Sequence, residues 1–183
     1  MSTQTATPTG TWNIDPSHSN VAFSVKHMGI ATVRGAFTEF EGTLELGEDL
    51  SSSRAYGSVE VASVDTAEQT RDDHLRSPDF FHAEEHPKLT FESTEIKSAG
   101  DDELEITGDL TIHGVTKPVS FKAEITGIEP EDPWGNERVG LEVTGKIDRS
   151  DYGMKFNQAL GSGNVMVSDQ VKLSLDISAV KAA

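Results

Sequence analysis

The chain has 183 residues and no cysteine, and its 31 acidic side chains against 15 basic ones give a formal net charge of −16. The absence of cysteine excludes disulfides, thiolate metal sites and a cysteine nucleophile. Because lysine and arginine form no cluster in this acidic chain, we expect it to bind no nucleic acid and to make no stable insertion into an anionic membrane.

The first ten residues, "MSTQTATPTG", are polar. They contain neither the basic nor the apolar region of a secretory signal peptide, and no later apolar stretch approaches the ~20 residues that a membrane-spanning helix needs. We therefore expect residues 1–10 to form a flexible lead-in, residues 11–183 to form a single domain, and the protein to reside in the cytoplasm.

Alternation of apolar and polar residues dominates the remaining chain and is typical of strands with one buried face. After a short strand at "WNI", the run "NVAFSVKH" predicts a second strand. In segment 32–46 the apolar residues change from odd to even positions, which requires an extra residue and predicts a bulge or strong bend near Thr38–Glu39. Further alternating runs lie at residues 55–64, 88–96, 103–112, 119–125, 139–147 and 171–177.

One helix is predicted, in the stretch "DTAEQTRDDHLRSPDFF" at residues 65–81. Thr66 and Gln69 match a capping box, which marks the start of a helix. Ser77 and Pro78 can then open a short turn. The segment 150–170 contains several glycines and serines and predicts a long loop, and loops of this length are usually functional or mobile.

Strands with one apolar face each must bury that face, either between two sheets or inside a closed barrel. Long bent strands joined by short turns favour closure, which also removes exposed sheet edges. The sequence therefore predicts an all-β fold, an antiparallel barrel of about eight strands with one short helical region. A barrel of this size is either filled by side chains or holds one small ligand, and the sequence leaves both alternatives open.

The motif "HAEEH" at residues 82–86 matches the H-x-x-E-H zinc pattern, with His82 and His86 as ligands and Glu85 as the base. That chemistry needs a helix, and Pro87 directly after the motif disfavours helical dihedrals at His86. We therefore expect no metal site, no catalytic residue and no cofactor. A metal-dependent hydrolase built on this motif is kept as an alternative.

Two other histidines bear on metal binding. His74 could join His82 and His86 in a looser metal site, although no strand pairing predicts that the three meet. His113 stands just before a glycine, and we expect it at the surface or in a turn.

Four motifs occur in a fixed order along the chain: "WNIDPSHSNVAFSVKHMGIATVRGAF", "RDDHLRSPDFF" followed by Pro87, "GDLTIHGVTKPV", and "DRSDYGM". Together they resemble the YceI-like, lipid/polyisoprenoid-binding family, and the resemblance runs from about Trp12 to Val180. It implies an extended, lipocalin-like barrel with a helix by one end. It also implies an internal tunnel for a long apolar molecule, such as a polyprenyl chain or an isoprenoid quinone, and a homodimer.

We therefore expect a binding protein that sequesters or carries such an isoprenoid or a similar amphiphilic lipid. The predicted tunnel lining consists of apolar residues of the strands and of the two loops: Phe23, Val25, Phe37, Phe40, Phe80, Phe81, Phe91, Phe121, Leu141, Val143, Met154 and Phe156.

The histidines at the two ends of the second predicted strand, His18 and His27, are candidates for contacts with a ligand head group at the tunnel mouth. Nine residues of strand separate them by roughly 30 Å, so they cannot share a metal. A third alternative for the whole protein is a structural or stress-related dimer whose barrel is packed solid.

Overall fold

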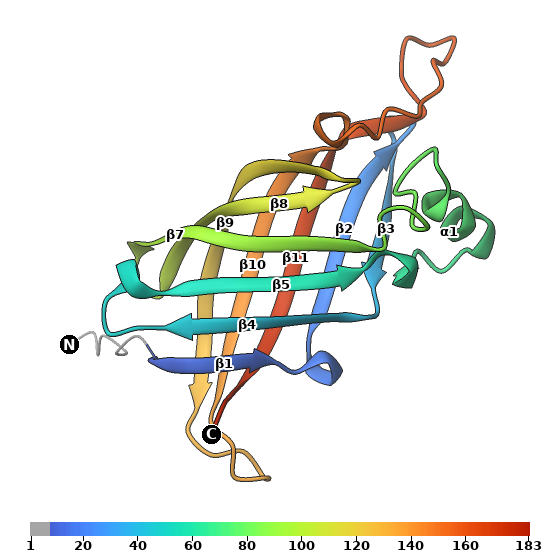
Figure 1. The fold of residues 1–183 in the computed structure, drawn as a ribbon. Coiled ribbons are helices and arrows are strands. Elements are labelled where there is room, and N and C mark those ends of the chain that lie inside the picture. Colours follow the sequence, from blue (N-terminus) through green and yellow to red (C-terminus); the bar gives the residue numbers. More distant parts are fainter. Residues whose placement is uncertain (1–7) are drawn as a thin grey trace.

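The computed structural model describes residues 8–183, so residues 1–7 of the expected flexible lead-in lie outside the described part. Antiparallel pairing closes eight strands into a ring, because β1 pairs with β11 as well as with β4 (Figure 1). The predicted eight-stranded antiparallel barrel is thereby confirmed. Around the ring the strands are β1 (Gly10–Ile14), β4 (Phe40–Leu46), β5 (Arg54–Glu60), β7 (Lys88–Gly100), β8 (Glu103–Ile112), β9 (Val115–Glu129), β10 (Arg138–Asp148) and β11 (Val167–Lys181).

Three further strands continue this wall toward one end of the barrel: β2 (Asn20–His27), β3 (Ala31–Phe37) and β6 (Val64–Asp65). The last residues of β11 pair with β1, and its earlier residues pair with β2. The 3-10 turn η1 (Pro16–His18) lies between β1 and β2, and both of these strands pair with β11. The third 3-10 turn, η3 (Val61–Ser63), likewise divides β5 from β6, whereas the sequence predicted one strand over 55–64.

The predicted bend at Thr38–Glu39 is confirmed, and it separates β3 from β4. The two strands have different partners, since β3 pairs with β2 and β6 while β4 pairs with β1 and β5. The change of phase in the sequence therefore reflects a chain that bends along the barrel wall and not one strand with a single inserted residue.

The helix α1 (Gln69–Arg76) lies at one end of the barrel and the C-terminus lies at the other (Figure 1). The Arg76 guanidinium ties α1 to the wall by donating to the carbonyl oxygens of Ala62 and Val64. With eight residues, α1 is too short to cross a bilayer, and no other helix in residues 8–183 is long and apolar enough to do so.

The start of α1 differs from the predicted capping box. Glu68 is the N-cap, and its carboxylate accepts a hydrogen bond from the amide of Arg71. Thr66 lies two residues too early to cap the helix, and both its amide and its hydroxyl donate to the buried carboxylate of Asp72. The expected turn at Ser77 is confirmed, because the amide of Phe80 donates to the Ser77 carbonyl oxygen.

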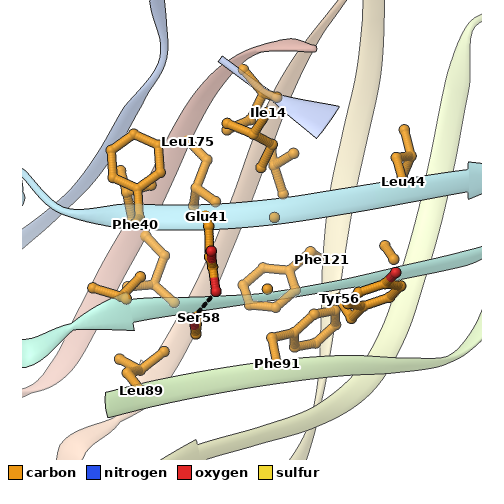
Figure 2. Close-up of a pocket in the computed structure, with 18 of the residues that line it drawn as sticks. Ile14, Phe40, Glu41, Leu44, Tyr56, Ser58, Leu89, Phe91, Phe121 and Leu175 are labelled. Atoms are coloured by element: carbon orange, nitrogen blue, oxygen red, sulfur yellow. Dashed lines mark hydrogen bonds between the residues drawn. The ribbon is translucent and has the colours of Figure 1, made fainter. Parts of the chain in front are cut away.

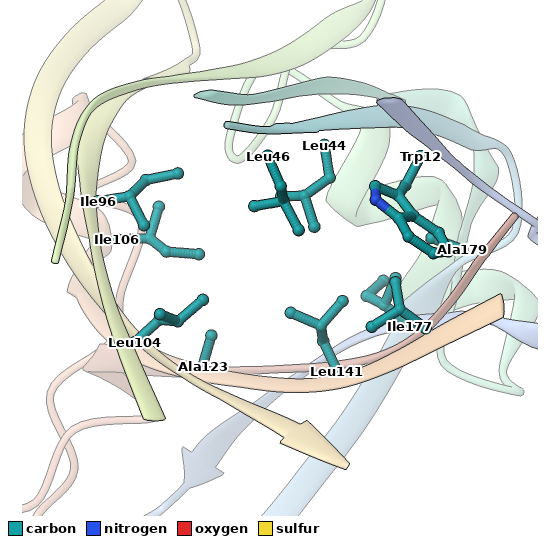
Figure 3. Packing of buried hydrophobic residues seen from close by; sticks show 11 residues of the cluster. Trp12, Leu44, Leu46, Ile96, Leu104, Ile106, Ala123, Leu141, Ile177 and Ala179 are labelled. Carbon is teal, nitrogen blue, oxygen red and sulfur yellow. The ribbon is translucent and has the colours of Figure 1, made fainter. Parts of the chain in front are cut away.

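Buried side chains fill the barrel in three clusters. The largest lies toward the end with the C-terminus, where Trp12 of β1 and aliphatic residues of six other strands point inward (Figure 3). A second cluster, around Phe121 and Tyr152, lies between β8, β9 and β10 near the other end. The third joins Phe37, Val59 and Val64 where the wall meets α1. The alternation read from the sequence therefore places one face of each strand in the interior.

An ionic network holds the turn between β1 and β2. Asp15 caps η1 through the Ser17 amide, and its other carboxylate oxygen lies 2.9 Å from the guanidinium of Arg138 on β10. The same guanidinium donates to Asp132 in the β9–β10 turn at 2.6 Å. Arg138, followed by hydrogen bonds from Ser17 and His18, holds the pKa of Asp15 well below its usual range. Burial opposes the effect at Asp132, but the Asn136 amide and Arg138 still lower the pKa of that carboxyl.

We expect Arg138→Gln to lower the melting temperature at pH 7 and to lower it much less in acid. Both carboxyl groups have depressed pKa values in the folded protein, so their stabilising effect is complete above the ordinary carboxyl pKa of about 4 and is lost as the pH falls further. Melting curves between pH 7 and acid pH measure this. Arg54→Gln, which removes an exposed ion pair with Glu92, is the control and should change little. An equal deficit of Arg138→Gln at all pH values would contradict the assignment.

Candidate functional site

The barrel contains an apolar cavity of about 210 Å³ (Figure 2). Inward-facing side chains of β4, β5, β7 and β8 line one side, and those of β9, β10 and β11 line the other. The barrel is therefore neither packed solid nor an open channel. The main apolar lining residues are Ile14, Val21, Phe37, Phe40, Leu44, Val59, Leu89, Phe91, Ile106, Leu110, Phe121, Leu141, Val143, Leu173, Leu175 and Ile177.

Two phenylalanine rings form part of this lining, and each is covered on one side by a glycine of a neighbouring strand. A Cβ atom at Gly108 would lie 2.6 Å from the Phe91 ring, and one at Gly145 would overlap the ring of Phe121. The two rings meet edge to face, with centroids 5.4 Å apart. The bare glycine backbones therefore let both rings lie close to the wall and leave space in the middle of the barrel.

The wall of the barrel has a gap in its strand pairing beside η1. The β1–β4 ladder stops at Asn13↔Thr43 and the β2–β3 ladder stops at Val21↔Phe37, so within the described residues no strand pairing joins 14–20 to 38–42. Ala22 lies next to this gap and Glu41 lies within it, both at outward-facing positions, yet both line the cavity. We infer from these two positions that the cavity opens to the outside here.

Polar groups surround the outer side of this opening. The Ser58 hydroxyl lies 3.5 Å from the Glu41 carboxylate, as the dashed line in Figure 2 marks. The Tyr56 hydroxyl donates to Glu45, and the Arg54 guanidinium lies 4.5 Å above the Tyr56 ring. An outer groove shares Glu41, Tyr56 and Ser58 with the cavity. An apolar interior thus meets a polar rim at the wall of the barrel.

Six of the twelve predicted tunnel residues line the cavity: Phe37, Phe40, Phe91, Phe121, Leu141 and Val143. Two other strand residues do not line it in the described structure. Phe23 packs on Gly35 and against Phe37, and Val25 lies between Val33 and Val171 on the neighbouring strands.

The four predicted residues from the loops also lie away from the cavity lining of the described chain. Phe80 and Phe156 pack against each other and against the His74 ring, with centroids 4.9 to 5.3 Å apart, which joins α1 to the loop after β10. Met154 is buried in the Tyr152 cluster, and Phe81 meets Phe37 at the barrel end. The aromatic and methionine side chains of these loops are buried against neighbouring side chains and cover the end of the barrel near α1.

The two histidines proposed for the tunnel mouth have different surroundings. His18 belongs to η1, beside the side opening, where its Nδ1 lies 2.8 Å from the Asp15 carboxylate. His27 ends β2 and pairs with Ala31 and Val167, at the end of the barrel that carries α1. Only His18 is therefore placed near a route into the cavity.

A second cluster of functional groups lies at the end of the barrel near α1, where His82, His86 and His113 meet. One ring nitrogen of each residue lies within 4.8 Å of the other two. His74, which the sequence offers as a third partner of His82 and His86, instead contacts Asp79, Phe80 and Phe156. Residues 82–86 form turns and not a helix, as expected from Pro87.

Comparisons with known proteins agree with this architecture. Residues 12–179 match the family model described as a YceI-like domain. Protein YceI of Escherichia coli is 41% identical over 149 residues, which cover 81% of this chain and 77% of the relative. The crystal structure of Burkholderia cenocepacia BcnA has a TM-score of 0.79 at 22% identity and covers 90% of this chain and 98% of BcnA. A polyisoprenoid binding domain from Saccharophagus degradans has a TM-score of 0.72 at 14% identity and covers 93% of this chain and 98% of that domain.

The contact between Gly145 and Phe121 generates a prediction for the cavity. A methyl group at Gly145 would force the Phe121 ring toward the cavity, so we expect Gly145→Ala to destabilise the protein by about 1–3 kcal/mol, as overpacking of a core does. Urea unfolding measures the change. Gly127→Ala on β9 is the matched control, because nothing lies within 4 Å of the added methyl group. Equal stabilities of the two variants would show that Phe121 has free room to move.

Proposed function

The chain belongs to the YceI-like family, and on that premise we propose that its barrel binds a long apolar isoprenoid-type molecule, a polyprenyl chain or an isoprenoid quinone, and sequesters or carries it. The observation that carries the proposal is the apolar cavity of about 210 Å³ inside the barrel. The Saccharophagus degradans domain, which shares the fold, is named as polyisoprenoid-binding and supports the ligand class.

The size of the cavity limits how much of a chain it holds without rearrangement. A protein cavity of about 150 Å³ accepts one benzene ring, so about 210 Å³ corresponds to roughly eight carbon atoms, between one and two isoprene units. A longer chain must displace side chains of the lining, or extend through the side opening. Phe91 and Phe121 are the side chains that we propose move, because both line the cavity and meet each other only edge to face.

The polar rim suggests how an amphiphilic ligand is oriented. We propose that the apolar tail enters beside η1 and that the polar head stays near Glu41, Tyr56 and Ser58 on the outside. His18, exposed in η1 beside the opening, is the one of the two predicted head-group histidines that fits this orientation. The six predicted tunnel residues that line the cavity are the ones that we propose contact the tail.

Among the three functions that the sequence left open, the binding protein is the one that the geometry favours. The cavity argues against a barrel packed solid. The H-x-x-E-H zinc helix of a hydrolase does not form, and the Glu85 side chain is exposed. A homodimer and a cytoplasmic location stay predictions.

A series of prenyl tails of increasing length tests the proposed binding. Each buried CH₂-sized group contributes roughly 0.8 kcal/mol, and ordering of the flexible tail offsets much of this gain. We expect the affinity to rise over the first few isoprene units and then to level off, because the cavity and its extension become full. Fluorescence or calorimetric titration of the purified chain measures each affinity.

Val143→Trp tests whether the tail lies in the cavity. Val143 lines the cavity between the two larger clusters, so the indole should shorten the preferred tail and lower the melting temperature little. Thr144→Trp is the control, because Thr144 is the next residue of β10 and lies exposed on the outer face. No binding at any tail length, together with a sharply lowered melting temperature for Val143→Trp, would mean that the interior holds no ligand.

A further inference from the structure

Three of the six histidines of the chain meet on one side of the barrel end, and none of them lines the apolar cavity of the described chain. His82 and His86 come from the segment that leads into β7, and His113 comes from the turn between β8 and β9. The ring of His86 lies between the other two, with centroids 6.0 Å from His82 and 4.9 Å from His113. All three side chains are half-buried.

The backbone brings the three rings together without a helix. The amide of His86 donates to the carbonyl oxygen of His82 at 2.9 Å, which closes a single turn and places the two rings 6.0 Å apart. His113 and Gly114 form the two-residue turn between the paired residues Ile112 and Val115, and both have positive φ. A Cβ atom at Gly114 would lie 2.8 Å from the His86 ring, so the glycine is what lets this ring lie on the turn.

A neighbouring acceptor orients the ring of His113. Nδ1 of His113 lies 3.0 Å from the carbonyl oxygen of the buried Tyr152, so the Nδ1–H donates there and the lone pair is left on Nε2. Histidines that bind metals commonly donate their second ring nitrogen to a carbonyl or a carboxylate in this way, which fixes the tautomer and the direction of the other nitrogen.

We propose that His82, His86 and His113 bind one divalent transition-metal ion of the class that prefers imidazole, for which Zn²⁺ is the probe. Tetrahedral coordination with metal–nitrogen distances of about 2.0–2.1 Å places the ligand nitrogens about 3.4 Å apart, so small rotations of the rings suffice from the observed separation of up to 4.8 Å. Three nitrogen ligands suit Zn²⁺, Cu²⁺ or Ni²⁺ and do not suit Mg²⁺ or Ca²⁺, which require oxygen ligands. Water completes the fourth position.

This inference replaces the sequence-based expectation of no metal site. That expectation rested on the need for a helix at "HAEEH", whereas the turn at residues 82–86 brings the same two rings together and His113 adds a third. A bound ion would connect the segment after α1 to the β8–β9 turn and so fasten this end of the barrel. No reaction is assigned to the ion, and the site is independent of ligand binding in the cavity.

Calorimetric titration of the chain, free of any histidine tag, with Zn²⁺ tests the proposal. We expect one ion per chain, and about a tenfold or greater loss of affinity in each of His82→Gln, His86→Gln and His113→Gln. The three remaining histidines provide matched controls, because His18→Gln, His27→Gln and His74→Gln remove the same group elsewhere. Excess Ca²⁺ should not compete.

Two further measurements keep the outcome clear if a variant folds poorly. Zn²⁺ should raise the melting temperature of the wild type and not that of the triple variant, since only a ligand of the folded state stabilises it. Co²⁺ should give the visible absorption of a tetrahedral site in the wild type and in the controls. Failure of the wild type to bind stoichiometric Zn²⁺, or an equal loss of affinity in cluster and control variants, would overturn the proposal.

Discussion

The pairing of β11 is the constraint on which the barrel and its opening depend. One edge of this strand pairs with β10 over nearly its full length, while the other edge pairs first with β2 and then with β1. Between these two partners the Ser19 hydroxyl hydrogen-bonds both the carbonyl oxygen and the amide of Ser178, in place of the ladder that η1 interrupts. The barrel therefore closes on the β11 side, while the opposite side of η1 is left open toward the bend between β3 and β4.

This local break explains how an apolar interior becomes accessible without a separate lid. Strand alternation places apolar side chains inside along the strands, and the glycines beneath Phe91 and Phe121 let these two rings lie near the wall. Asp15 and Arg138 hold η1 in position at the edge of the opening. Loop residues around Phe80 and Phe156 cover the barrel end near α1, so the described route into the cavity is lateral.

The sequence predicts the elements of this fold better than it predicts the site. Period-two alternation depends on neighbouring residues, so the strands and the bend at Thr38–Glu39 could be located. The side opening depends on the pairing of β1 and β2 with β11, whose paired residues lie about 140 to 170 positions later in the chain, and no local pattern contains it. Phe80 and Phe156 were expected in the tunnel because loop aromatics often line pockets, but the structure packs them together outside it. Two features of the sequence point to the histidine cluster: His113 stands beside a glycine in a turn, and His82 and His86 are four residues apart.

The most direct test of the account is to identify what the barrel holds. The purified chain, incubated with an isoprenoid-containing lipid extract and purified again without detergent, is extracted with organic solvent and the extract is analysed by mass spectrometry. The same chain, heat-unfolded before incubation, gives the background. We predict close to one isoprenoid-type molecule per folded chain, enriched over the phospholipids of the mixture. A folded chain that retains no isoprenoid above the background of the unfolded chain would contradict the proposed function.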